Sequence, residues 1–192
     1  MPILSEWDVH FPNCAPVGHH LRIVFAEHWV RFHSLPGAKR YPEQEAEYAE
    51  VLARHNCILG ELAPLGTPVV LLTTEYSPSL LPPRASPELA RIQPGGAAWR
   101  TVAMHEIDED FHTPSYWHLF ASLHQWHPGT FDRLVRLVAD EVVFNVLIVS
   151  ADCRWVLHPY DGGMDVITDS ARARARLRAR HAAWLSARPD GL

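Results

Sequence analysis

The sequence predicts an α+β fold: one domain with a mixed sheet of six or seven strands and three or four packed helices. Three observations support this class. Residues 69–74 (VVLLTT) form a continuous apolar and β-branched run, which is typical of a strand buried on both faces. Residues 154–159 and 163–168 flank an Asp-Gly-Gly turn, which indicates an antiparallel hairpin. Because helical patterns and hairpins both occur, α+β is favoured over a doubly wound sheet.

The first half of the chain is expected to alternate between helices and strands. Residues 15–27 can form a short helix, and residues 29–34 (WVRFHS) alternate apolar and polar side chains as a strand does. A helix is expected to begin at Pro42, since proline suits the first helical position and glutamates follow it. Together with strand 69–74 these elements predict a right-handed crossover unit. The apolar stripe of the helix is expected to comprise Tyr48, Leu52, His55, Leu59 and Leu62.

The second half begins with a proline-rich stretch. Residues 76–97 contain five prolines, so we expect an irregular segment with one helical turn at 87–91. Residues 98–107 and 115–126 are expected to pair as antiparallel strands. The remaining elements are expected at 130–140 (a helix capped by Thr130), 142–150 (a buried strand) and 170–187 (a helix capped by Ser170).

Size and composition limit the class of protein. The 192 residues are expected to form a single globular domain over 1–192, because no segment resembles a linker. A net charge of -5 makes nucleic acid an unlikely partner and disfavours anionic membranes. Three cysteines without a CxxC pair do not form a disulfide framework. Without a signal peptide or a long apolar run, the chain is expected to be cytoplasmic, with no membrane association.

Four segments carry a resemblance to a known family: WVRFHSLPGAKRYPE (29–43), YAEVLARHNCILGEL (48–62), WVLHPYDGGMDVI (155–167) and WLSARPDGL (184–192). Together they resemble a bacterial family of small domains of unknown function. The resemblance implies an α+β fold and a bacterial cytoplasmic protein, and it assigns no catalytic residue. Some small families of this kind act as immunity proteins against toxins. By that analogy, the leading hypothesis is a non-enzymatic binding module for a protein partner.

Cationic residues near the first predicted strand indicate a second kind of partner, a small anionic ligand. Lys39 and Arg40 follow a Pro-Gly turn and precede a helix, where backbone N–H groups also favour anions. With Arg31 they are the candidates for binding an anion or an acidic partner. The alternative is that Lys39 and Arg40 pair with helix acids such as Glu43 or with the surrounding acidic surface. Exposed pairs of this kind contribute only about 0–1 kcal/mol to stability.

Histidines and carboxylates support an alternative function, a small hydrolase or a nucleotide- or phosphate-binding enzyme. The candidate catalytic residues are His33, His158, Asp161 and Asp165, which combine groups suited to acid–base chemistry. A simpler interpretation is that Asp161 makes the hairpin turn and Asp165 points to solvent. The chain contains no Walker loop, GxGxxG or HExxH, so no standard motif supports the enzyme.

Thirteen histidines raise the question of a metal site. In the segment HEIDEDFH (105–112) and the strand after it, a hairpin would place His105 opposite His118, with Cβ atoms about 5 Å apart. A register change of one residue would place Glu106 there instead. A second set comprises His10, Cys14, His19 and His20. Neither spacing matches an established ligand motif, so we expect no bound metal and no cofactor.

Overall fold

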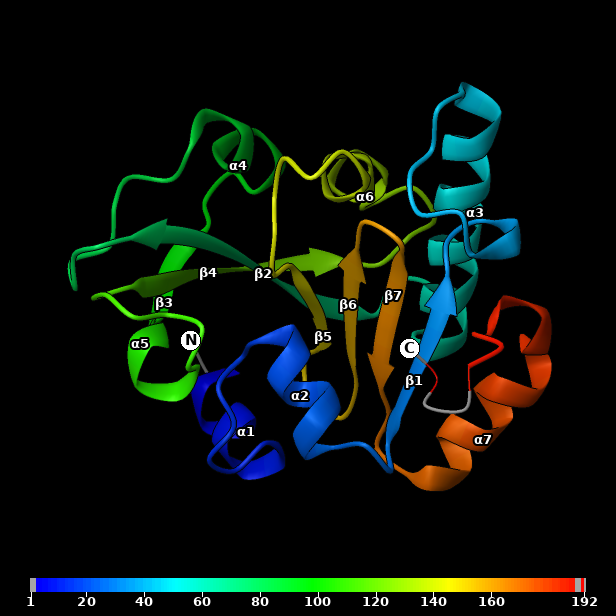
Figure 1. The fold of residues 1–192 in the computed structure, drawn as a ribbon, viewed down its shortest axis with the longest axis horizontal. Helices are drawn as coiled ribbons and strands as arrows, with labels where there is room; N and C mark the ends of the chain where they lie inside the picture. The colour runs from blue at the N-terminus through cyan, green and yellow to red at the C-terminus, as the bar shows by residue number, and fades with distance from the viewer. Residues whose placement is uncertain (1–2, 189–190, 192) are drawn as a thin grey trace.

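The computed structural model describes residues 3–188 and 191. Within them, seven strands form one sheet in the order β1-β7-β6-β5-β2-β4-β3 (Figure 1). The strands are β1 (Trp29–His33), β2 (Pro68–Ser77), β3 (Ala97–Ala103), β4 (Tyr116–Gln125), β5 (Leu147–Ser150), β6 (Val156–Tyr160) and β7 (Gly163–Ile167). The predicted α+β class is confirmed. The expectation of a mixed sheet was wrong, because every neighbouring pair of strands is antiparallel.

The antiparallel order follows from where β1 pairs. Strands β1 and β2 run in the same direction, as a crossover requires, but three strands lie between them. The β6–β7 hairpin binds β1 along its outer edge, with Trp29 opposite Ile167. On its other side the hairpin meets β5, which pairs with β2. The crossover therefore joins strands that are not neighbours.

Helices cover both faces of the sheet. They are α1 (Ile3–His10), α2 (Gly18–Val24), α3 (Glu45–Leu62), α4 (Pro87–Ile92), α5 (Met104–Ile107), α6 (Asp132–Ala139) and α7 (Ala171–Arg180), with 3-10 turns at Pro36–Ala38 and Ala182–Trp184. The four expected helices correspond to α2, α3, α6 and α7, and α4 forms the turn expected in the proline-rich segment. The short helices α1 and α5 were not expected.

Several predicted boundaries differ from the structure. The hydroxyl of Ser170 accepts a hydrogen bond from the Ala173 N–H, so this predicted cap is confirmed. Thr130 does not cap α6, because its hydroxyl accepts from the N–H of His127 instead. Helix α3 begins at Glu45 rather than Pro42. Strand β5 covers only the end of the predicted 142–150 strand.

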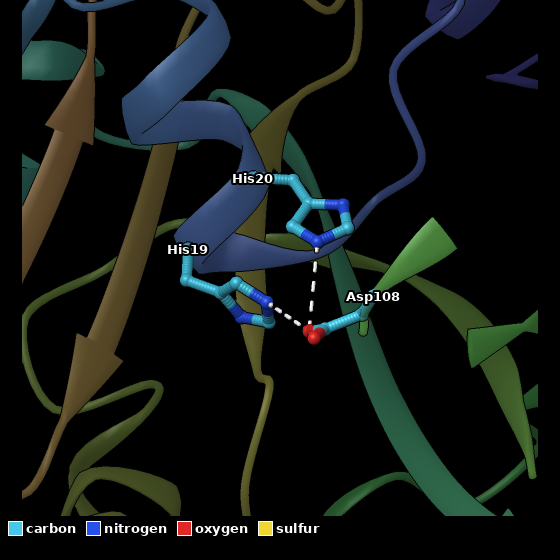
Figure 2. A group of neighbouring side chains, drawn as sticks. All are labelled: His19, His20 and Asp108. Atoms are coloured by element: carbon cyan, nitrogen blue, oxygen red, sulfur yellow. Dashed lines mark hydrogen bonds and ion pairs between the residues drawn. The ribbon is translucent and has the colours of Figure 1, made fainter. Parts of the chain in front are cut away.

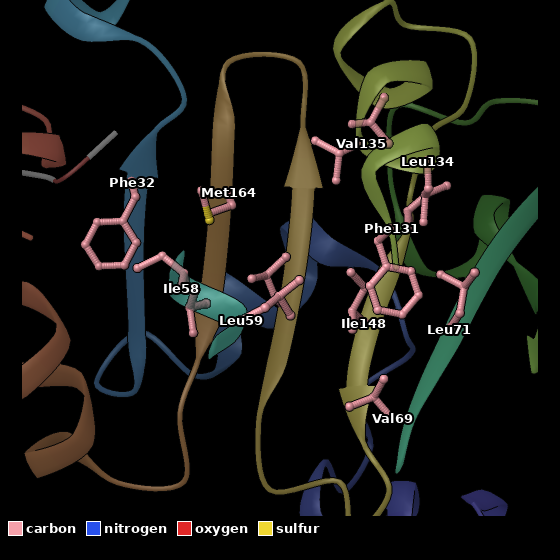
Figure 3. Close-up of a cluster of buried hydrophobic side chains, with 14 of the residues drawn as sticks. Phe32, Ile58, Leu59, Val69, Leu71, Phe131, Leu134, Val135, Ile148 and Met164 are labelled. Carbon is pink, nitrogen blue, oxygen red and sulfur yellow. The ribbon is translucent and has the colours of Figure 1, made fainter. Parts of the chain in front are cut away.

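Two apolar cores follow from the two-residue period of the strands. One core lies between the sheet and helices α3, α6 and α7, where Phe32, Ile58 and Phe131 are buried (Figure 3). The other lies under α1, α2 and α5 and contains Trp7 and Leu21. Burying each large side chain stabilises the fold by roughly 1.5–3 kcal/mol.

The predicted apolar stripe of helix α3 is confirmed in part. His55 and Leu59 are buried, whereas Leu52 is only partly buried. Val51 and Ile58 take core positions that the predicted stripe did not include. The helix is therefore rotated slightly from the orientation that the apolar spacing indicated.

Helix α2 is held close to the β6–β7–β1 end of the sheet by a glycine. A Cβ atom added at Gly18 would lie 2.3 Å from the imidazole of His158, so no larger residue fits. The Gly18 N–H also donates to Oδ1 of Asn145, at 2.9 Å. This close contact brings the polar side chains of α2 above the polar positions of three strands.

Candidate functional site

A row of polar residues crosses three adjacent strands. Asp165 of β7 lies directly opposite Arg31 of β1 on one side and His158 of β6 on the other. Their chain neighbours Phe32 and Met164 belong to the core on the far face. Because strand side chains alternate between faces, the three polar side chains all lie on the face that α2 covers.

Arg31 and Asp165 form a bidentate ion pair, joined by two hydrogen bonds. Arg31 donates from Nε to Oδ1 at 2.8 Å and from Nη2 to Oδ2 at 2.9 Å, and Asp165 is 2% exposed. Burial lowers the pKa of Arg31, but hydrogen bonding and charge from Asp165 outweigh it, and the net pKa is raised. The guanidinium also lies 4.6 Å from the ring centre of Tyr160. Asp165 therefore does not point to solvent, contrary to the simpler interpretation of the sequence.

The side chain of His158 is partly buried, 16% exposed, and neutral at pH 7. Burial lowers its pKa to about 4. Its Nδ1 lies 4.0 Å from Oδ2 of Asp165 and has no hydrogen-bond partner among the described residues. His33, two residues after Arg31 on the same face, also has a lowered pKa, because of burial and the charges of Arg31 and Arg54. Both imidazoles therefore present uncharged nitrogen atoms near neutral pH.

A cavity of about 420 Å³ opens between α2 and these strands, and we call it the arginine cavity. It is lined by His19, Arg22, Arg31, His33, Ala38, Arg40, His158, Tyr160, Gly162 and Asp165.

A second cavity of about 380 Å³, the aromatic cavity, shares His19, His158 and Tyr160 with the first. Its other lining residues are mainly apolar and include Trp117, Val143 and Phe144. The two cavities therefore meet at the shared residues. Together they join an end lined by arginines to an end lined mainly by apolar side chains, with Glu141 and Asp161 as its acidic groups.

Positive charge exceeds negative charge around the arginine cavity. Arg31 is balanced by Asp165, and Nε of Arg40 donates to Asp161 at the hairpin turn. No side chain of the described residues forms an ion pair or hydrogen bond with the side chain of Arg22. These three arginines and two aspartates carry a net formal charge of +1. The cavity is therefore suited to an anion.

Most of the candidate site residues predicted from the sequence lie around these two cavities. His33, His158, Asp165, Arg31 and Arg40 line the arginine cavity, and Asp161 lines the aromatic cavity.

Lys39 does not join them. It lies 2.6 Å from Glu47 and 3.3 Å from Glu43, as the alternative interpretation of this loop predicts, and it is absent from the described lining of both cavities. The sequence interpretation missed Arg22 and the role of His19 in this site. Their i, i+3 spacing on one helix was the available signal, because such residues share a face.

The predicted metal candidates do not meet. His118 lies opposite Thr101, not His105, so the predicted pairing was wrong. The cause is α5, which replaces the end of the expected strand with a helical turn. Both ring nitrogens of His118 are already bonded, one to the Thr101 hydroxyl and one to the carbonyl of Ser79. His105 contacts the backbone of Ser115 instead.

The second predicted set of metal ligands, His10, Cys14, His19 and His20, does not converge on one point either. Cys14 is buried, and burial raises the pKa of its thiol to about 11, so it stays a protonated thiol rather than the thiolate that binds metals. His10 lies 3.9 Å from Glu6. His19 and His20 instead approach Asp108, which belongs to the other predicted set (Figure 2).

The fold and this site define a class: an α+β domain whose antiparallel sheet carries a cavity lined by arginine and histidine. The chain belongs to the family described as Domain of unknown function (DUF3885), whose sequence model matches residues 17–189. This confirms the resemblance to a family of unknown function. No curated protein and no solved structure matches the chain. Among the described helices, none has the length and apolar character needed to cross a membrane.

Proposed function

We propose that this protein binds a small anionic ligand, bearing a phosphate or carboxylate group, in the arginine cavity. The observation that supports it most directly is Arg22, a partly buried arginine that lines the cavity and has no acid partner among the described residues. A bound anion would give this guanidinium the charged hydrogen-bond partner that it lacks. Charge-assisted hydrogen bonds are about twice as strong as neutral ones.

The other two arginines are oriented by their acid partners. Arg31 uses Nε and Nη2 on Asp165, which leaves part of its set of five N–H donors for a ligand. Arg40 uses Nε on Asp161. Each aspartate therefore holds a guanidinium in place without using all of its donors. Such fixed groups bind an anion with little loss of side-chain entropy.

The aromatic cavity supports a ligand that has an apolar part as well as a charge. Trp117 and Phe144 line this cavity, and their ring centres lie 5.2 Å apart in an edge-on arrangement. A ligand with its anion near Arg22 can place an apolar or aromatic group against these rings. Ligand cavities commonly combine an apolar lining with a few well-placed polar groups.

This proposal differs from the leading hypothesis from the sequence, a binding module for a protein partner. The charged side chains converge in a cavity rather than spreading over a flat face, which favours a small ligand. A hydrolase acting on such a ligand is the second candidate. It is supported by His158, whose buried Nδ1 has no hydrogen-bond partner among residues 3–188, since a neutral imidazole can accept a proton.

Titration with inorganic phosphate, followed by two-dimensional NMR, tests the proposal. We expect shifts in amides of α2, β1 and β7 and weaker binding in Arg22→Gln, by roughly tenfold, because a lost charged hydrogen bond costs about 1.5–3 kcal/mol. Arg133→Gln is the matched control, since Arg133 is an exposed arginine on α6. Lys39→Ala should also bind normally. Equal phosphate affinity in Arg22→Gln and wild type, or no shifts in the wild type, would contradict the proposal.

A further inference from the structure

Asp108 is positioned with one carboxylate oxygen bonded and the other directed at α2. Its backbone N–H donates to the carbonyl of Met104 and ends helix α5. Its Oδ1 accepts a hydrogen bond from the Asp110 N–H, at 3.1 Å. The carboxylate is 14% exposed, and Oδ2 lies toward the first turn of α2. The backbone of the α5 turn therefore fixes the direction of this side chain.

Two consecutive histidines of α2 converge on that single oxygen. Nε2 of His19 lies 2.9 Å from Oδ2, and Nε2 of His20 lies 3.7 Å from it. Figure 2 shows both imidazole rings turned toward the Asp108 carboxylate. The longer distance exceeds that of a hydrogen bond. A simple hydrogen bond between α2 and α5 therefore explains His19 but not the orientation of His20.

We propose that His19, His20 and Asp108 form a binding site for a divalent transition-metal ion, Zn²⁺ or Fe²⁺. The ligand atoms of the three residues all lie within 4.8 Å of one another. A tetrahedral ion with bonds of about 2.0–2.1 Å separates its ligand atoms by about 3.3 Å, so shifts of about 1.5 Å or less accommodate it. Two imidazoles and one carboxylate are a ligand set used for zinc and for non-haem iron(II).

A second group of potential metal ligands differs from the Asp108 group because its carboxylate already has a cationic partner. Cys57, Glu61 and His181 also lie close together. There, however, Oε2 of Glu61 already accepts from Arg180, and Oε1 lies 2.6 Å from Nε2 of His181. The neighbouring arginine supplies the positive charge that a metal would bring. The Asp108 group has no arginine or lysine among the described partners of its carboxylate.

Three protein ligands leave at least one coordination position open, which is the arrangement of catalytic rather than structural zinc sites. His19 lines both the arginine cavity and the aromatic cavity, so the ion lies beside the space assigned to the anionic ligand. The metal site goes beyond the proposed anion binding and does not rest on it, because none of the three arginines is a ligand.

Calorimetric titration of the untagged, chelator-treated protein with Zn²⁺ tests the site. We expect one equivalent to bind to the wild type, and binding to weaken by at least about tenfold in both Asp108→Asn and His20→Gln, since even second-shell changes cost about 10–100-fold. His112→Gln is the matched control, because His112 is an exposed histidine only four residues after Asp108. That variant should bind Zn²⁺ like the wild type.

Two results would overturn the site: no zinc binding by the wild type, or wild-type affinity in both ligand variants. Urea unfolding midpoints without metal show whether each variant is folded, and His20→Gln provides the test if Asp108→Asn unfolds. Phosphate titration of His20→Gln separates the two proposals, because His20 does not line the described part of the arginine cavity. Normal phosphate binding with lost zinc binding supports the metal site independently of the proposed function.

Discussion

Acid should destabilise this protein through His55, a residue of helix α3 whose side chain is buried. His55 is 2% exposed, and its Nδ1 donates to the carbonyl of Val51 at 2.8 Å. Burial lowers the pKa of His55 from 6.5 to about 4. The imidazole is therefore neutral in the folded protein at pH 5, whereas the same side chain in the unfolded chain has taken up a proton. Below pH 6.5 the unfolded state binds more protons, so stability falls as pH falls.

The size of this effect follows from the two pKa values. Each pH unit between them changes the free energy of unfolding by about 1.4 kcal/mol. From pH 7 to pH 5, His55 should therefore remove about 2 kcal/mol of stability. For a chain of this size, that lowers the melting temperature by about 4–8 °C. The loss should level off below about pH 4, where both states are protonated.

Urea unfolding at pH 7 and pH 5 measures this change. We compare the wild type with His55→Gln, which keeps a polar side chain but cannot titrate, and with the exposed control His112→Gln. Other histidines with a lowered pKa, such as His158, titrate in all three proteins, so the difference between proteins isolates one residue. The stability lost between the two pH values should be about 2 kcal/mol smaller in His55→Gln than in the wild type. Equal losses would refute a buried neutral His55.

Two further substitutions test the packing of the site. Asp165→Asn leaves the side chain of Arg31, which is only 12% exposed, without its charge partner, so thermal unfolding should show a loss of about 3–5 kcal/mol. The double variant Arg31→Met with Asp165→Leu should recover much of this loss, and no recovery would contradict the assigned cost of the unpaired charge. Gly18→Ala places a Cβ 2.3 Å from the His158 ring, so urea unfolding should show a loss of about 1–3 kcal/mol. The control Gly60→Ala meets open space and should be neutral or stabilising, and equal effects of the two changes would contradict the close contact at α2.

Local signals in the sequence predicted most of the elements correctly. The alternation in WVRFH corresponds to β1, the Asp-Gly turn joins β6 to β7, and Ser170 caps α7. Each of these features depends on interactions within a few residues. The prediction failed at Thr130 and in the α5 segment, where a local hydrogen bond or turn competed with the expected structure.

The candidate site was predictable only in part. Arg31, Arg40, His33 and His158 were selected for their chemical type and their place in short motifs. Nothing in the sequence showed that they would surround one cavity. Lys39 was selected by the same criteria, yet it pairs with nearby glutamates.

The sequence by itself determined the α+β class, the positions of most strands and helices, and the chemical groups available for function. Only the tertiary structure decided which groups meet. Arg31 and Asp165 are 134 residues apart, and they pair because β1 binds the outer edge of the β6–β7 hairpin in one register. His19 and Asp108 are 89 residues apart and meet because α2 and α5 cover the same face of the sheet. Such contacts depend on which strand edges and apolar faces pack together, and a residue's near neighbours in the sequence do not encode that choice.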